Sequence, residues 1–238
     1  MNRKLLALGV ITGVMSAQPA FAWTGDAELG ASLTSGNTEN TNVIAKLDVD
    51  TAANSWRHNL FGDIYYAEDD NLKSAERYSA GYKPRYFFTA QDYLFGLVRY
   101  DQDKFSFIDD RWTEVLGYGH LFLNSTAHYL DGEIGVGARQ STYVVDPSTA
   151  NLSEDETIGF LGAKYVGRIS NTARFSEIVR VEAGEDNTFV ESITGLGMTV
   201  TDTVSAKLTY TVRHNSDVVG VKGEKTDSVT GVNLVYSF

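Results

Sequence analysis

Four histidines are the side chains in this chain best suited to acid–base or metal chemistry, and their spacing supports neither. None of His58, His120, His128 and His214 belongs to an H-E-x-x-H motif or forms a metal-ligand pair on one strand face. No G-x-S-x-G motif is present, and no histidine has a serine and an acid clustered beside it. The chain has no cysteine, which excludes disulfides and cysteine-based zinc or thiol chemistry. We therefore expect no catalytic residues and no cofactor.

Carboxylates are more abundant, with 31 Asp and Glu against 20 Lys and Arg and a net charge of −11. This balance argues against nucleic acid as a partner, because phosphate binding needs a basic surface. Asp101-Gln102-Asp103 begins like a calcium loop, but Phe105 stands at a ligand position and Trp112 replaces the closing glutamate. No metal site is assigned. The remaining candidates are the acids of this segment: Asp101, Asp103, Asp109 and Asp110.

The elements that must position these side chains follow a period of two residues. In the segment 204–213, for example, Val204, Ala206 and Leu208 alternate with Ser205 and Lys207. Such alternation is typical of strands with one apolar and one polar face. Short turns are expected near 52–55, 89–92, 124–127, 170–173 and 201–203, and mostly longer loops near 35–40, 67–75, 101–111, 143–156, 185–188 and 215–225.

Eleven connections predict twelve strands, and ten is the alternative. Pro84 falls inside the fourth strand, where it removes a ladder donor and could mark a bulge or kink. Segments 92–100 and 111–123 carry apolar residues on both faces, so their register is ambiguous.

Two features indicate that the apolar face meets lipid rather than the core of a soluble barrel. Alternating short and long connections are typical of the two ends of an outer-membrane barrel. Aromatic residues also gather near both strand ends, as expected for two membrane interfaces. They are Trp23, Trp56, Phe87, Phe88, Tyr93, Phe122, Tyr129, Phe175 and Tyr236 near the short turns, and Tyr65, Tyr66, Tyr78, Tyr100, Trp112 and Phe189 near the long loops. The sequence thus predicts an all-β fold, a closed antiparallel transmembrane β-barrel.

Both chain ends fit this fold. Arg3 and Lys4 precede a ten-residue apolar run and an Ala20-Phe21-Ala22 cleavage site, so residues 1–22 are predicted to be a secretory signal and 23–238 the barrel. The C-terminal alternation resembles the strand by which bacterial outer-membrane proteins are recognised for assembly. The alternative is an ordinary final strand. The predicted assembly signal, read by the barrel assembly machinery, is Phe238, Tyr236, Leu234 and Val232.

A family resemblance supports this interpretation. Trp23-Thr24-Gly25, Gly30-Ala31-Ser32 and the segment 34–39 (Thr-Ser-Gly-Asn-Thr-Glu) resemble the start of the YdiY-like salt-induced outer-membrane proteins. The likeness extends over the mature chain in length, strand rhythm and the final Tyr-Ser-Phe. It implies a barrel in the outer membrane of a Gram-negative bacterium, with a link to salt or osmotic stress and no catalytic residues to carry over.

Charge gives the functional hypotheses. The predicted lumen face carries eleven basic and six acidic residues, and its basic members include Lys46, Arg57, Arg77, Arg139, Lys164, Arg180, Lys207 and Arg213. The surplus predicts a narrow passive channel for small solutes or ions with a weak anion preference. The alternative is a plugged structural barrel whose acidic loops share Ca²⁺ or Mg²⁺ with lipopolysaccharide. An outer-membrane enzyme with a triad built from distant strands comes third. We expect a monomer in contact with outer-membrane lipid.

Overall fold

The computed structural model describes residues 23–35, 41–69, 72–103, 108–143, 152–217 and 224–238. These residues form twelve strands: β1 (Trp23–Ser35), β2 (Thr41–Ala53), β3 (Trp56–Asp69), β4 (Leu72–Phe87), β5 (Asp92–Asp103), β6 (Ile108–Asn124), β7 (His128–Tyr143), β8 (Leu152–Arg168), β9 (Ala173–Ala183), β10 (Thr188–Thr199), β11 (Val204–Asn215) and β12 (Thr226–Ser237). The predicted signal segment and the centres of several predicted loops lie outside the described residues. Among the described residues, no helix has the length and apolar character needed to cross a membrane.

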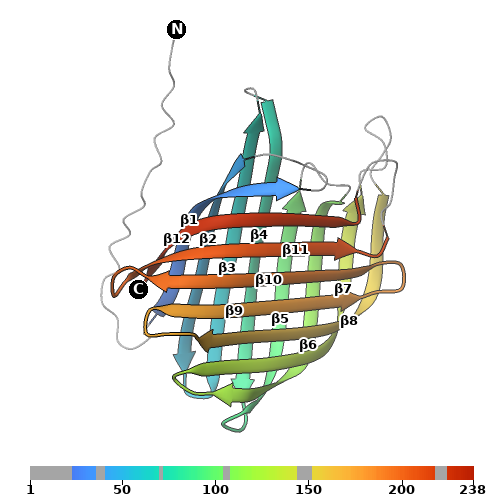
Figure 1. The fold of residues 1–238 in the computed structure, drawn as a ribbon. Coiled ribbons are helices and arrows are strands. Elements are labelled where there is room, and N and C mark those ends of the chain that lie inside the picture. Colours follow the sequence, from blue (N-terminus) through green and yellow to red (C-terminus); the bar gives the residue numbers. More distant parts are fainter. Residues whose placement is uncertain (1–22, 36–40, 70–71, 104–107, 144–151, 218–223) are drawn as a thin grey trace, which may run out of the picture.

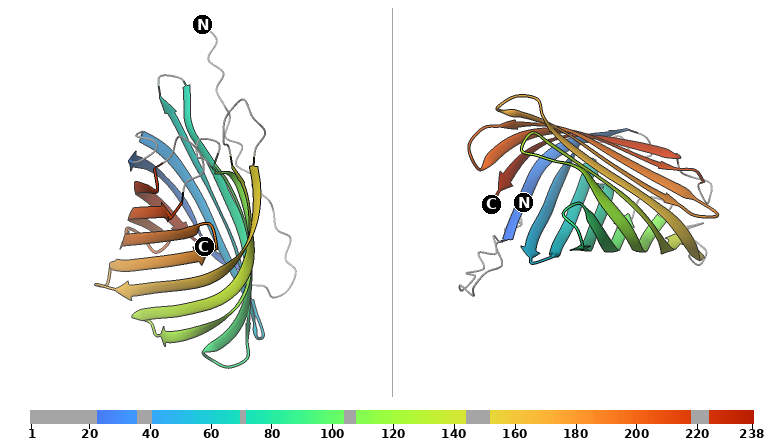
Figure 2. Two further views of the ribbon diagram at one scale, coloured as in Figure 1. Left: turned by 90° about the vertical axis from the view of Figure 1, so that its right-hand side faces the viewer. Right: turned by 90° about the horizontal axis from the view of Figure 1, so that it is seen from below.

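The strands pair antiparallel in sequence order, and β1 pairs with β12 to close the barrel. In Figure 1, β9–β12 cross in front of β2–β5 at a steep angle, as opposite walls of a barrel with tilted strands do. Figure 2 shows the same two walls facing each other. Closure gives every strand two partners, which satisfies the backbone within the barrel. The predicted fold is confirmed, with twelve strands rather than ten.

The two ends of the barrel differ. Five connections of two to four residues lie at one end, here called the turn end, and the other six lie at the loop end. The tightest turn joins β2 to β3 through Asn54 and Ser55. Asn54 has φ 54°, a left-handed conformation that asparagine tolerates better than most residues. The chain termini of the barrel lie side by side at the turn end, where the backbones of Gly25 and Phe238 exchange two hydrogen bonds of 3.0 Å.

Successive side chains of each strand point alternately to the outside and to the inside of the barrel. Leu47, Leu60 and Ile64 are about half exposed on the outward face (49%, 46% and 50%), while Lys46 and Asp63 point inward between them. Large apolar residues are exposed in the same way on most strands. Exposed apolar surface of this extent and period is expected in lipid and not in water.

Pro84 interrupts one ladder without changing its register. Tyr82 pairs with Val98 and Arg85 pairs with Phe95, so β4 and β5 stay aligned across a gap at Lys83 and Pro84. The register shifts that the structure does contain lie elsewhere, at Ala67/Glu68, Ile108/Asp110 and Leu121/Leu123.

Candidate channel lumen

The structure places all eight basic residues predicted for the lumen on the inward face. Lys46 lies opposite Glu28 and Asp63, and Arg77 lies opposite Asp103. The others occupy inward positions of β3, β7, β8, β9 and β11. The inward face is therefore lined with charge, and most of that charge is organised into a few connected groups.

The largest group begins at Arg139 in the loop half of the barrel. Its guanidinium is 0% exposed and forms ion pairs with Glu156 of β8 and, at 3.5 Å, with Glu182 of β9. It also donates to the backbone carbonyl of Asn187 in the β9–β10 connection. A buried charge needs partners of this kind, because the penalty for leaving water is several kcal/mol per ion. Arg139 therefore ties three strands and one loop together.

Arg180 continues the group along the same wall. It pairs with Glu182 and, at 3.2 Å, with Glu191 of β10, which also accepts a hydrogen bond of 2.7 Å from Arg213 of β11. Of the predicted lumen residues, the structure thus brings Arg139, Arg180 and Arg213 into one chain of ion pairs.

A smaller cluster fills the opposite side of the loop half. Ile44, Tyr65, Ala67 and Val229 form a buried apolar group that spans β12, β2 and β3. Arg77 lies over the Tyr65 ring at 5.2 Å and reaches Asp63 at 4.0 Å. The lumen is therefore narrowed from both sides at this level.

Between these groups a small central cavity of about 80 Å³ remains, here called the arginine constriction. This volume is well above the roughly 15 Å³ that a cavity needs to hold a water molecule. It is lined from both walls by four arginines, three aspartates and three other residues: Arg77, Arg111, Arg180, Arg213, Asp101, Asp103, Asp227, Ile108, Phe189 and Asn215.

The turn half contains an apolar core inside the barrel, which the sequence did not predict. Its buried members are Tyr93, Phe95, Leu97, Val115, Leu121, Ile158 and Phe160, with Phe61, Phe87 and Tyr129 packed against them. This core explains why β5 and β6 are apolar on both faces, since one face meets lipid and the other fills the lumen. The prediction that the aromatic residues near strand ends lie at the membrane interfaces is wrong for Phe87, Tyr93, Tyr129, Tyr65 and Phe189, which all point inward.

Polar groups anchor this core. The Tyr93 hydroxyl donates to Asp131 at 2.9 Å and lies 3.0 Å from Glu133. Lys83 pairs with Glu133, and Arg85 lies 3.5 Å from Glu133 and 3.8 Å from Asp131. The core thus closes the turn half along β3–β8.

The remaining side of the turn half, along β9–β12 and β1–β2, is polar and less filled. Lys207 pairs with Glu28 at 2.6 Å, and Asn233 donates to Glu28 at 3.3 Å. Lys164 and Ile178 are opposite each other and are both exposed on the inward face. A path through the barrel would therefore run from the arginine constriction along this side.

The inward face is closer to neutral than the sequence predicted. Asp101, Asp103 and Glu156 were assigned to loops, but the structure places them on β5 and β8, facing inward. The acids Glu28 and Glu191 and the bases Arg99 and Arg111 also join the inward set. The added acids outnumber the added bases, which reduces the predicted surplus. The period of two, continued beyond the predicted strand ends, would have found most of these residues.

The four metal candidates are not brought together. Asp101 forms two hydrogen bonds of 2.7 Å with Arg99, and Asp103 also lies on the inward face of β5. Asp110 is a β6 residue opposite Gln102, and Asp109 lies at a register shift. No group of three or more histidines and carboxylates in the described part of the chain could hold a metal. Asp70, Lys104, Asp146 and Lys222 of the predicted loops lie outside the described residues.

The histidines lie on the outward face, and three of them contact aromatic rings. Nδ1 of His120 also lies 2.7 Å from a carboxylate oxygen of Asp92, so an acid does lie beside this histidine. Nδ1 of His58 is 2.7 Å from the Tyr82 hydroxyl, and Nδ1 of His128 is 3.0 Å from the Tyr165 hydroxyl. His120 packs edge-on against Phe122. His214, at the loop end, contacts the Thr226 hydroxyl at 2.8 Å. These contacts suit interfacial rings.

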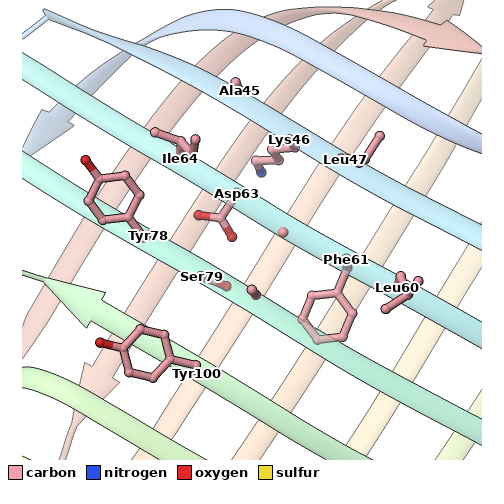
Figure 3. Close-up of a pocket in the computed structure, with 12 residues that line it drawn as sticks. Ala45, Lys46, Leu47, Leu60, Phe61, Asp63, Ile64, Tyr78, Ser79 and Tyr100 are labelled. Atoms are coloured by element: carbon pink, nitrogen blue, oxygen red, sulfur yellow. The ribbon is translucent and has the colours of Figure 1, made fainter. Parts of the chain in front are cut away.

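The outward face carries an apolar groove of about 500 Å³ across β2–β5. Gly62 is among the residues that line it, and Figure 3 shows Tyr78 and Tyr100 toward one end with Leu47 and Leu60 toward the other. Because Leu47, Leu60 and Ile64 are exposed on the outward face, this groove is separate from the lumen.

Solved structures of low sequence identity share the fold. The NanC porin has a TM-score of 0.56 at 9% identity, covering 89% of this chain and 100% of its own. The translocator domain of the autotransporter NalP from Neisseria meningitidis has a TM-score of 0.53 at 12% identity, covering 92% and 90%. The COG4313 outer-membrane channel from Pseudomonas putida F1 has a TM-score of 0.50 at 12% identity, covering 97% and 100%.

Sequence comparison gives the family. The Uncharacterized protein YdiY of Escherichia coli K12 is 29% identical over 213 residues, covering 90% of this chain and 82% of its own. The model of the family described as "Protein of unknown function, DUF481" matches residues 27–238, nearly the whole barrel. The resemblance seen in the sequence is confirmed, and the chain belongs to this family.

Proposed function

We propose that the protein is an outer-membrane β-barrel that acts as a narrow passive channel for small solutes or ions. The exposed apolar outer face and the outward aromatic residues near the strand ends suit a bilayer. The short connections of the turn end suit the periplasmic side of the membrane. Similar folds are found in a porin and an outer-membrane channel. Cleavage of residues 1–22 and a link to salt stress belong to this proposal.

The observation that carries the channel proposal is the arginine constriction. Charged residues from opposite walls meet there around a cavity of about 80 Å³, a volume that can hold water or a small ion. Below it the β9–β12 side offers a polar route past Lys207 and Lys164 to the turn end. A passage this narrow predicts low conductance.

A plugged structural barrel is the second candidate, and the filled lumen favours it. Arg139, Glu156 and Glu182 fill one side of the loop half, and the core around Phe95 and Phe160 fills much of the turn half. Such packing stabilises a barrel without transport. In this version the acidic loops bind divalent cations and lipopolysaccharide.

Planar-bilayer recording separates the two candidates. Residues 23–238 are refolded and inserted, and insertion is verified by heat-modifiable gel mobility. For the channel, discrete current steps are expected, and under a salt gradient the current should reverse at a non-zero potential that reports the ion preference. A barrel that is inserted but silent at all tested voltages would contradict it and favour the plugged barrel.

A further inference from the structure

Arg111 of β6 differs from the other arginines of the arginine constriction. It is 5% exposed, yet no described carboxylate lies within ion-pair distance of it. Its Nε donates to the Ser141 hydroxyl at 3.2 Å, and its Nη2 atom has no hydrogen-bond partner among the described residues. Within the part of the chain that the structure describes, Arg111 is therefore a buried cation without an ion-pair partner.

Burial of this kind is costly. A guanidinium stays protonated in proteins, so Arg111 cannot relieve the penalty by losing its proton. A buried ion that lacks a partner carries an uncompensated desolvation penalty. One hydroxyl and one aromatic ring compensate only part of it.

Other cations lie close to Arg111. The ring of Phe189 lies 5.3 Å from the Arg111 guanidinium and 4.9 Å from that of Arg180, so two cations share one ring. Arg77 and Arg213 line the same cavity.

The acids near Arg111 already have partners. Glu191 is held by Arg180 and Arg213, and Asp101 forms a two-point contact with Arg99. Asp103 and Asp227 have contacts of their own. A free anion therefore suits the position beside Arg111 better than the described side chains do.

We propose that the arginine constriction contains a binding subsite for a small oxyanion, a carboxylate or a phosphate, centred on Arg111. The planar guanidinium offers donors that match two oxygens of such a group. Phe189 holds that guanidinium and the one of Arg180 on the cavity wall. The subsite deepens the proposed channel function, and it rests on that function for its effect on current.

Binding is tested on the full barrel purified from membranes, with inorganic phosphate and acetate as probes and chloride at matched ionic strength as reference. Either probe should raise the midpoint of thermal unfolding saturably in the native chain. Arg111→Gln should abolish this rise. Arg174→Gln removes the same charge from an exposed position at the turn end and should retain it. A saturable rise that persists in Arg111→Gln, or no rise in the native chain, would overturn the subsite.

Arg111→Lys keeps the experiment decisive if the glutamine variant does not fold. It retains the charge but loses the two-point donor geometry, so at least a tenfold weaker apparent affinity for phosphate is expected. Unchanged affinity in Arg111→Lys would contradict the proposed geometry.

Current recordings distinguish failure of the subsite from failure of the channel. Phosphate should reduce the chloride current of the native barrel and should have less effect on Arg111→Gln. A barrel that conducts but neither binds phosphate nor is blocked by it would contradict the subsite and leave the channel standing. Saturable phosphate binding in a silent barrel would support the subsite and contradict the channel.

Discussion

Arg139 joins strands of the loop half through buried ion pairs. Replacement by alanine leaves Glu156 without its ion-pair partner and leaves Glu182, itself 0% exposed, with Arg180 alone. Breaking a buried pair by removing one partner costs about 3–5 kcal/mol. We expect Arg139→Ala to lower the unfolding free energy by this amount in urea titrations of the barrel in vesicles.

The matched control is Arg168→Ala, which removes an exposed arginine at the end of β8. A change within about 0.5 kcal/mol is expected for it, because surface substitutions usually have small effects. Equal losses in both variants would show that the ion pairs of Arg139 contribute little. An altered conductance in Arg139→Ala would in addition support the channel over the plugged barrel.

At the residue scale, sequence patterning placed the eight predicted basic residues on the inward face, but it missed Arg99 and Arg111 and did not give the ion-pair partners. The period of two fixed the side of each strand on which Arg180 and Arg213 lie. It gave no information on pairs across the lumen, such as Arg111 with Phe189, because these join β6 to β10. Contacts between non-neighbouring strands depend on barrel diameter and stagger, which alternation does not encode.

Strands β5 and β6 show how the elements depend on close packing inside the barrel. The ring of Tyr93 on β5 lies directly over Gly119 of β6, so a Cβ at that position would overlap the ring. We expect Gly119→Ala to force Tyr93 away from Asp131 and to destabilise the barrel by about 1–3 kcal/mol, as overpacking does. The midpoint of heat-modifiable mobility would measure the loss.

Gly96→Ala on β5, the strand next to Gly119, is the matched control. A Cβ there would meet Pro84 at 3.6 Å and Leu116 at 3.7 Å, which are ordinary contacts. Its midpoint should stay close to that of the native chain. If Gly119→Ala behaved like Gly96→Ala, the core around Tyr93 would be looser than the structure indicates.

The apolar core inside the barrel is the part of the elements that the sequence did not predict. The twelve strands were predicted from the two-residue period, and the alternation of short and long connections from the small residues at the short turns. The aromatic residues near strand ends were all interpreted as interfacial, because sequence alone does not separate a ring facing lipid from one facing a filled lumen. Tyr93 and Phe95 are separated from Arg99 by even numbers of residues along β5, so all three lie on the same, inward face. This spacing could have revealed the core.

The whole molecule is closed by the pairing of β1 with β12, and this closure involves the last residue. Phe238 is bonded to Gly25 through the backbone, while its ring lies on the outward face, stacked with Tyr236 at 6.2 Å. Leu234 and Val232 continue the exposed row. The side chain therefore adds little packing inside the barrel, which leaves room for a role in recognition by the assembly machinery.

Phe238→Ala separates recognition from stability. If the ring is an assembly signal, the variant should accumulate much less folded barrel in cells, at least several-fold, yet refold in vitro into detergent or vesicles as well as the native chain. The backbone bonds to Gly25 do not need the ring, so the refolded barrel should show nearly native heat-modifiable mobility. Leu208→Ala removes an outward side chain of similar exposure from β11, outside the C-terminal row, and should assemble in cells at near-native levels. Equal folded yields of Phe238→Ala and the native chain in cells would contradict a signal at this residue, whereas failure of both routes would assign the ring to stability instead.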